Sequence, residues 1–272
     1  MFLSEPKRTG YDLNFSLLGF PCRVHPAFFI LPLLFGRSFV GGANVVGANV
    51  VGANPVNTGV GLVLIAALFF VSILVHELGH AIAFRRFGID SRIVLYWMGG
   101  LAIPDSGNPW GGRSNSRSLT SNQQIIVSLA GPIFGFLVAV FFILLVLAVG
   151  GSIEMFYGAY VPLPIPVFTE TIFENNAAMK TLIYAGIVIN VFLNLLNLVP
   201  IYPLDGGQVA RELMLKFDSA NGIRNSLLLS IGCAVLIAVV ALSSEDQFLA
   251  IFFGFMAYSN FQSLQQFSGP RW

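Results

Sequence analysis

The chain has 272 residues, of which 56% are apolar, 13% aromatic and only 10% charged. Soluble globular domains carry about 25% charged residues, so the composition excludes an ordinary water-soluble protein and predicts an integral membrane protein. The 14 Lys and Arg nearly balance the 13 Asp and Glu, which gives no sign of a nucleic-acid partner. Cys22 and Cys233 are too few and too far apart for a disulfide scaffold or a thiolate metal site, and we interpret both as packing residues.

The apolar segments predict an all-α polytopic membrane protein with about six transmembrane helices. A helix needs about 20 apolar residues to cross the bilayer. Four segments are clear candidates for spans: 59–84, 125–149, 181–199 and 225–243. Two shorter segments, 25–40 before them and 247–261 after them, are weaker candidates. The runs are continuously apolar rather than alternating, which favours helices over a barrel. We expect a single domain, 1–272, with a core at about 59–211 and a small membrane-associated β-hairpin as a possible addition.

The first candidate span, 25–40, has an alternative interpretation. Lys7 and Arg8 precede it, as basic residues precede the apolar region of a signal peptide. Polar residues intervene and Pro26 and Pro32 interrupt the run, so a retained first span is favoured.

The basic residues orient the predicted bundle. With six spans and the N-terminus in the cytoplasm, the C-terminus is also cytoplasmic, and only Arg37 and Lys180 of the 14 basic residues fall outside. The positive-inside rule therefore supports this topology. The other basic residues all fall on the cytoplasmic side: Lys7, Arg8, Arg23, Arg85, Arg86, Arg92, Arg113, Arg117, Arg211, Lys216, Arg224 and Arg271.

The connections between spans are less informative. Residues 42–56 form a five-residue repeat, GANVV, GANVV, GANPV, and we expect an external loop there. The apolar connection 150–178 is expected to lie at the membrane surface. We expect no independent soluble domain in the polar segment 88–123 or after the last span.

The second predicted span contains three ionisable residues within five positions, His76, Glu77 and His80. Such a residue in hydrocarbon costs roughly 2.5–3.5 kcal/mol, which indicates a function. Residues four apart share a helix face, so both imidazoles can bind one metal ion with Glu77 beside them. This is the HExxH signature of zinc hydrolases. At about 1.5 Å per residue, His76 lies roughly 25 Å past Gly59, which places the site in the cytoplasmic third of the membrane.

The segment 89–104 follows the second span and has the pattern of a hairpin that dips toward the site. Its edge could pair with an extended substrate. The alternative is an interfacial loop anchored by Tyr96 and Trp97. The polar stretch 105–121 is the expected route for water.

A catalytic zinc ion needs a third protein ligand and an open position for water. The remaining histidine, His25, is interpreted as structural or gating, and Asp90 and Asp105 lie in the polar loop. Asp205 is better placed, because it ends the segment 197–205, after the fourth span and at similar depth. Prolines break the helix there, and the following paired glycines permit an unusual backbone that directs the carboxylate into the bundle. The alternative is a plain turn with Asp205 in solvent.

With these residues, the core of the chain resembles the site-2 protease family of intramembrane zinc metalloproteases. Three motifs carry the resemblance: HExxH at 76–80, Asn-x-x-Pro-x-x-Pro-x-Asp-Gly at 197–206 and, more weakly, Ser-Leu-Ala-Gly-Pro at 128–132. The resemblance implies that one zinc ion is bound by His76, His80 and Asp205. It further implies that Glu77 is the general base and that Asn197 is a polar group near the substrate or the oxyanion.

The chain departs from the family at Gly135, where the third-span motif often has Asn. Asn190 or Asn194 could supply the missing polar contact. Family members often carry a PDZ or CBS module, and neither is recognised in this sequence.

The resemblance implies a multi-pass zinc metalloendopeptidase of a bacterial or archaeal cell membrane. Its active site would face the cytoplasmic side, its substrates would be transmembrane proteins, and a regulatory membrane protein is a possible partner. The different class left open is a metal-ion or proton transporter that uses His76, His80 and Asp205 as an ion site. An inactive metal-binding scaffold is a third reading of the same residues.

Overall fold

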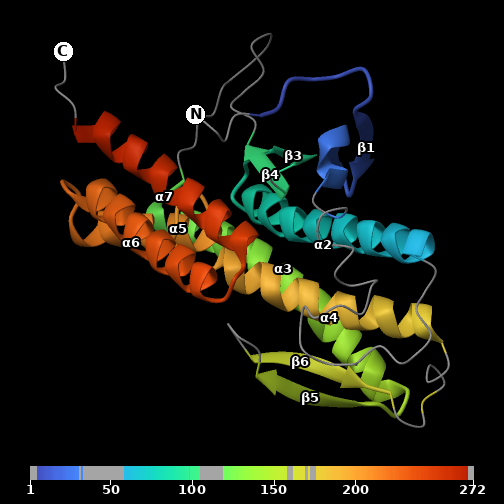
Figure 1. The fold of residues 1–272 in the computed structure, drawn as a ribbon. Helices are drawn as coiled ribbons and strands as arrows, with labels where there is room; N and C mark the ends of the chain where they lie inside the picture. The colour runs from blue at the N-terminus through green and yellow to red at the C-terminus, as the bar shows by residue number, and fades with distance from the viewer. Residues whose placement is uncertain are drawn as a thin grey trace. The chain divides into compact units, whose positions relative to one another are not determined.

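The structure is a computed structural model that describes residues 5–30, 32, 58–97, 99–104, 119–157, 162–168, 171 and 176–268. The chain divides into two compact units, drawn in Figure 1. The first unit contains Glu5–Ser114 and Ile133–Asn194, and the second contains Met1–Ser4, Asn115–Pro132 and Leu195–Trp272. The single-domain organisation stays a prediction.

Helices make up most of the described chain. They are α2 (Thr58–Arg86), α3 (Ser121–Ala148), α4 (Ala177–Asn197), α5 (Asp205–Phe217), α6 (Gly222–Ser243) and α7 (Gln247–Ser268), with a 3-10 turn η1 (Pro26–Phe29). Among the described residues, four helices are long and apolar enough to cross a membrane: Gly59–Arg86, Ser121–Ala148, Ala178–Asn197 and Gly222–Ser243. These helices match the four clear candidates for spans.

The two weaker spans stay predictions. The segment 247–261 is helical, as part of α7, but α7 is not among the four membrane-length apolar helices of the described chain. Most of the segment 25–40 lies outside the described residues, as do the repeat at 42–56 and most of the proposed water route at 105–121. The count of six spans and the cytoplasmic location of both termini are therefore still expectations.

The described chain is mostly helical, as predicted, but the first unit contains a four-stranded sheet where only a small β-hairpin was expected as an addition. Its strands are β1 (Leu13–Leu17), β2 (Phe20–Val24), β3 (Ser91–Tyr96) and β4 (Gly99–Pro104), in the order β1-β2-β3-β4. The β3–β4 hairpin confirms the hairpin reading of 89–104. The β1–β2 hairpin was missed, and its β2 pairs with β3 in parallel.

A third hairpin lies in the connection 150–178, which was expected to lie at the membrane surface. It is formed by β5 (Ser152–Tyr157) and β6 (Pro162–Val167). Prolines at alternating positions of β6, such as Pro164 and Pro166, made a strand hard to recognise from sequence. Alternate residues direct their backbone nitrogens to the same side, so these prolines can leave the pairing with β5 intact.

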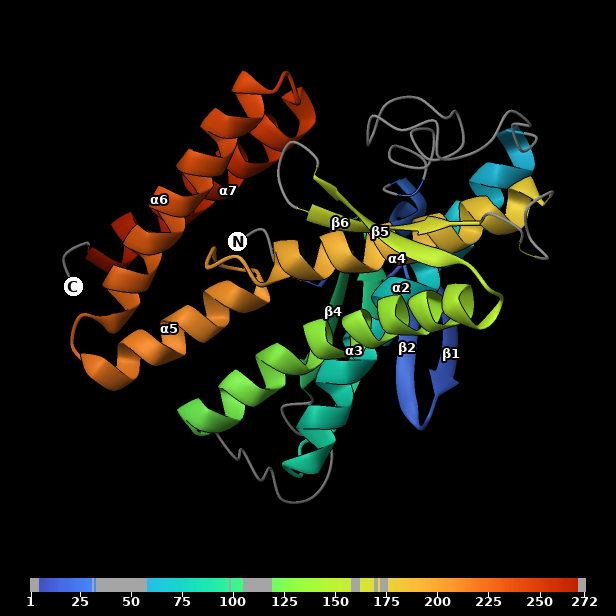
Figure 2. The same ribbon diagram turned by 90° about the horizontal axis from the view of Figure 1, so that it is seen from below.

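The four-stranded sheet packs against the second half of α2 (Figure 2). Leu74, Leu78 and Ala81 lie on one face of α2 and are buried against Phe20, Val24, Phe28, Ile93 and Leu95. Farther toward its start, α2 packs against α4 through a second cluster: Ile65, Leu68, Phe69, Ala185 and Ile189. The HExxH segment of α2 is thereby fixed to both a sheet and a neighbouring helix.

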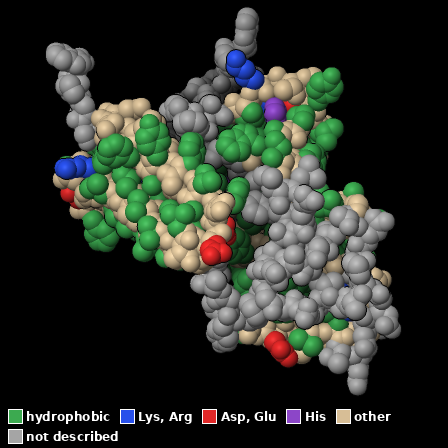
Figure 3. All heavy atoms as spheres, in the orientation of Figure 1, with side chains coloured by type: hydrophobic (Ala, Val, Ile, Leu, Met, Phe, Trp, Pro, Cys, Tyr) green, Lys and Arg blue, Asp and Glu red, His purple; other side chains and the backbone are tan. Residues whose placement is uncertain are grey.

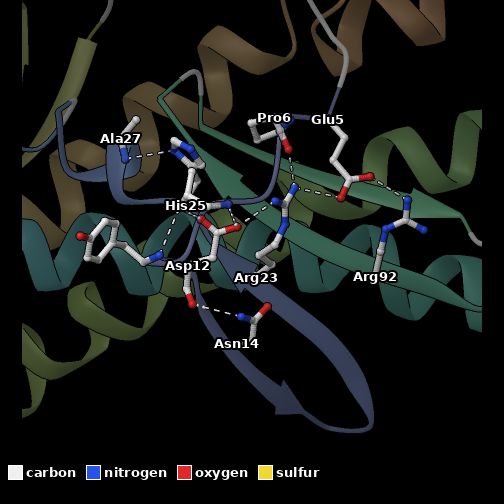
Figure 4. Close-up of polar contacts among 10 residues, drawn as sticks. Glu5, Pro6, Asp12, Asn14, Arg23, His25, Ala27 and Arg92 are labelled. Carbon is white, nitrogen blue, oxygen red and sulfur yellow. Dashed lines mark hydrogen bonds and ion pairs between the residues drawn. The ribbon is translucent and has the colours of Figure 1, made fainter.

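An ion-pair network ties the N-terminal segment to the sheet (Figure 4). Glu5 accepts hydrogen bonds from Arg23 at 2.9 Å and Arg92 at 2.8 Å, and Arg23 also donates to Asp12 at 3.0 Å. The hydrogen bond from Arg92 lowers the pKa of Glu5. The hydrogen bond from Thr9, with a further one from Arg23, lowers the pKa of Asp12. Both carboxylates are therefore held in the charged form that pairs with β2 and β3.

In the second unit, α6 and α7 pack together around Ile201. Ile201 is fully buried, in the turn between α4 and α5, among Ala234, Phe253, Met256 and Ala257. Apolar side chains cover much of the outer surface of α6 and α7, with few charges among them (Figure 3). Such a surface suits contact with lipid rather than water.

Candidate metal centre

His76, Glu77 and His80 lie together on α2 and are all buried, with exposed fractions of 8%, 6% and 7%. The Nε2 atoms of the two histidines are 3.2 Å apart. Two nitrogen ligands at about 2.0–2.1 Å from a tetrahedral zinc ion are separated by about 3.3 Å. The two imidazoles therefore have the spacing that a shared zinc ion requires.

Asn194 of α4 is the polar partner of His76. Its Oδ1 lies 2.8 Å from Nδ1 of His76, and its Nδ2 donates to the backbone carbonyl of Asn190. Asn190 in turn donates from Nδ2 to Oγ of Ser72 at 2.9 Å and to the carbonyl of Gly186 at 2.8 Å. The sequence offered Asn190 and Asn194 only as alternatives, and the structure places Asn194 beside the histidine.

Glu77 lies under β4. A Cβ atom added at Gly100 would be 2.3 Å from Cγ and 2.5 Å from Oε1 of Glu77, so any other residue at position 100 would force the side chain of Glu77 to move. The neighbouring Tyr96 is buried, and burial together with the charge of Glu77 raises its pKa to about 12. The hairpin predicted from sequence therefore covers the predicted general base.

Asp205 is the first residue of α5 in the second unit and has an exposed fraction of 7%. A plain turn with a solvated Asp205 is therefore wrong. The predicted role of the paired glycines was also wrong, because Gly206 and Gly207 are helical residues of α5. A Cβ at Gly206 would lie 2.1 Å from the carbonyl oxygen of Leu198, so close packing of the chain explains the glycine.

The turn that leads into Asp205 is held by α6 and α7. The backbone N–H of Tyr202 donates to Oγ of Ser230 at 3.0 Å, and Nδ2 of Asn260 donates to the carbonyl of Tyr202 at 2.6 Å. Asn197, the last residue of α4, is half-buried just before this turn. The helices predicted as accessory therefore position a predicted ligand, and Ser230 and Asn260 were not singled out from sequence.

The other acidic and histidine candidates lie elsewhere. Asp90 is exposed in the connection between α2 and β3, and Asp105 lies outside the described residues. The Nδ1 atom of His25 accepts the N–H of Ala27 at 3.2 Å and caps η1, in keeping with the structural role expected for it.

Comparisons with known proteins point in one direction. A search of solved structures finds the site-2 protease from Methanocaldococcus jannaschii with a TM-score of 0.52 and 20% identity, covering 93% of this chain and 95% of that one, which shows a shared fold. A zinc metalloprotease of the same organism is 22% identical over 204 residues, which are 74% of this chain. A Synechocystis sp. protein whose name proposes a zinc metalloprotease is 31% identical over 216 residues, which are 78% of this chain. The alignments cover only 45% of each of these two relatives.

The family model of peptidase family M50 matches residues 64–239. This range contains the HExxH segment of α2 and the segment with Asn197 and Asp205. With its long apolar helices, the chain is an integral membrane protein. The match covers well over half of the sequence and both principal motifs, and the chain therefore belongs to peptidase family M50, the site-2 protease family.

Proposed function

We propose that the chain is an intramembrane zinc metalloendopeptidase that hydrolyses peptide bonds in or near transmembrane segments of membrane proteins. The observation that carries this proposal is the buried group of His76, Glu77 and His80 on a helix long and apolar enough to span a membrane. Membership of peptidase family M50 and the names of the two relatives agree with it.

We propose that one zinc ion per chain is bound by His76, His80 and Asp205. All three residues are buried, and each offers one ligand atom of a type that zinc accepts. Burying charged or basic groups is costly, and a shared cation would offset part of that cost. Three protein ligands leave the fourth position open for chemistry.

When bound, the zinc ion supplies Lewis acidity that lowers the pKa of a water molecule and polarises a peptide carbonyl. Glu77 follows His76 directly and precedes His80 by three residues, and it accepts the proton of the attacking water as general base. It then delivers this proton to the leaving amine. Asn197 contributes a polar contact to the substrate or the oxyanion.

We propose that the substrate segment unfolds and pairs with the outer edge of β4. β4 is an edge strand in the described sheet, and at Gly100 it lies directly over Glu77. A peptide added there would expose its backbone carbonyls, which a transmembrane helix keeps in its own hydrogen bonds. A cysteine at Ala102 of β4 is expected to form a disulfide with a cysteine near the scissile bond of a reporter. A cysteine at exposed Ser152 of β5 is the control, and equal cross-linking at both sites would contradict strand pairing.

The site is proposed to face the cytoplasmic side, because most basic residues flank that side in the expected topology. The expected substrates are transmembrane proteins, and a regulatory membrane protein is a possible partner. The transporter alternative would need a polar path across the membrane. The predicted outer halves of the spans offer little beyond Ser72 and Asn190, which bond to each other.

Asp205→Asn tests the metal site, with Asp90→Asn as the matched control because Asp90 is exposed. We expect Asp205→Asn to lose zinc during dialysis and to lose cleavage of a membrane-peptide reporter, because the neutral amide is a poor zinc ligand. Asp90→Asn is expected to keep both. The measurements are elemental analysis of the purified chain and reporter cleavage in proteoliposomes. Zinc flux across the liposomes that depends on His76, without cleavage, would favour transport, and zinc binding with neither activity would indicate an inactive scaffold.

A further inference from the structure

The carboxamide of Asn194 is buried and held in one orientation. Its Nδ2 donates to the carbonyl of Asn190 one helical turn earlier, which directs Oδ1 to Nδ1 of His76 at 2.8 Å. Asn194 has an exposed fraction of only 3%. A carbonyl oxygen can only accept, so Nδ1 of His76 must be the donor in this hydrogen bond.

This hydrogen bond selects the tautomer of His76. A neutral imidazole carries one proton, and with that proton on Nδ1 the lone pair is on Nε2. Nε2 is the atom that faces His80 at 3.2 Å. Asn194 therefore aims the lone pair of His76 at the proposed zinc position.

Gly135 of α3 makes room for this carboxamide. A Cβ atom at Gly135 would lie 2.1 Å from Nδ2, 2.2 Å from Oδ1 and 2.4 Å from Cγ of Asn194. These distances are far below van der Waals contact, so even a methyl group would displace the amide from His76. The absence of a side chain at Gly135 thus leaves free the space that the amide occupies when it contacts His76.

We propose that Asn194 is a positioning residue for the zinc ligand His76, and that Gly135 is required to seat it. The proposal rests on the proposed function, because it assumes that His76 binds zinc. Removing the partner of a ligating histidine typically weakens metal binding by about 10–100-fold. The same loss of zinc affinity is expected whether the change is made at Asn194 or at Gly135.

The test compares Asn194→Ala, Gly135→Ala and the double variant with the unaltered chain. Gly135→Ala removes no polar group, and Gly232→Ala on α6 is its matched control because nothing lies within 4 Å of a Cβ there. Zinc affinity is measured by competition with a chelator in the purified chain of 272 residues, and the visible absorption of the Co²⁺-loaded chain reports the ligand field. Helical circular dichroism and the unfolding temperature show whether each variant is folded.

We expect both single variants to bind zinc about 10–100-fold more weakly and to shift the Co²⁺ absorption, with Gly232→Ala unchanged. The double variant is expected to be no weaker than Asn194→Ala alone, because both changes break one contact. Zinc affinity and Co²⁺ absorption that stay unaltered in either folded single variant would overturn the proposal. Failure of the unaltered chain to bind zinc would instead reject the proposed function.

Discussion

Replacing Glu77 with Gln is expected to lower reporter cleavage by a factor of about 10²–10⁴ and to leave the bound zinc in place. Gln has the size of Glu, so it fits under Gly100, where the space for the side chain is limited by the backbone of β4. It cannot accept a proton from water, however, and the proton transfer that the proposed mechanism assigns to residue 77 is lost. His76 and His80 keep their nitrogen ligands.

The control for this experiment is Glu154→Gln, because Glu154 is exposed on β5. The same two quantities are measured for both variants, the zinc content of the purified chain and the rate of cleavage in proteoliposomes. Cleavage near the original rate in a zinc-loaded Glu77→Gln chain would show that another group is the base. Loss of zinc together with cleavage would show that Glu77 holds the metal site together instead.

The sequence was sufficient for the elements with strong and regular signals. A span needs only a long apolar run, so α2, α3, α4 and α6 were recognised with errors of a few residues at their ends. The HExxH segment was recognised because its spacing of four residues places both histidines on one helix face. Asn190 and Asn194 were both considered from sequence as replacements for the asparagine that the family often has at position 135, and nothing in the sequence could say which of them faces His76.

The missed elements depend on contacts between distant parts of the chain. Five-residue strands such as β1 and β2 carry little periodic signal, and β2 is stabilised by parallel pairing with β3, about 70 residues later in the sequence. The helix α5 was not predicted, because Pro203 and the glycines at 206 and 207 resemble a loop. Their role depends on the backbone against which they pack, and a local pattern does not contain that information.

Gly206→Ala is expected to destabilise the turn that leads into Asp205. In an ordinary helix, alanine in place of glycine stabilises by about 1 kcal/mol. At Gly206 the added Cβ would lie 2.1 Å from the carbonyl oxygen and 2.3 Å from the carbonyl carbon of Leu198, and both are backbone atoms that no rotamer change can move. Overpacking of this kind costs about 1–3 kcal/mol or more, so the sign of the usual effect is reversed.

The strain that Gly206→Ala introduces should displace Asp205 before it unfolds the helical bundle. Asp205 is the adjacent residue, and the turn before it is pinned by Ser230 and Asn260, so α5 can relieve the clash only by moving its first residues. Gly206→Ala is therefore expected to lose zinc in dialysis and to lower the unfolding temperature. Gly254→Ala on α7, where a Cβ meets nothing within 4 Å, is expected to retain zinc and to unfold no earlier than the unaltered chain. If Gly206→Ala matched Gly254→Ala in both measurements, close packing would not be the reason for the glycine, and the conformation of this turn would not control the position of the Asp205 carboxylate.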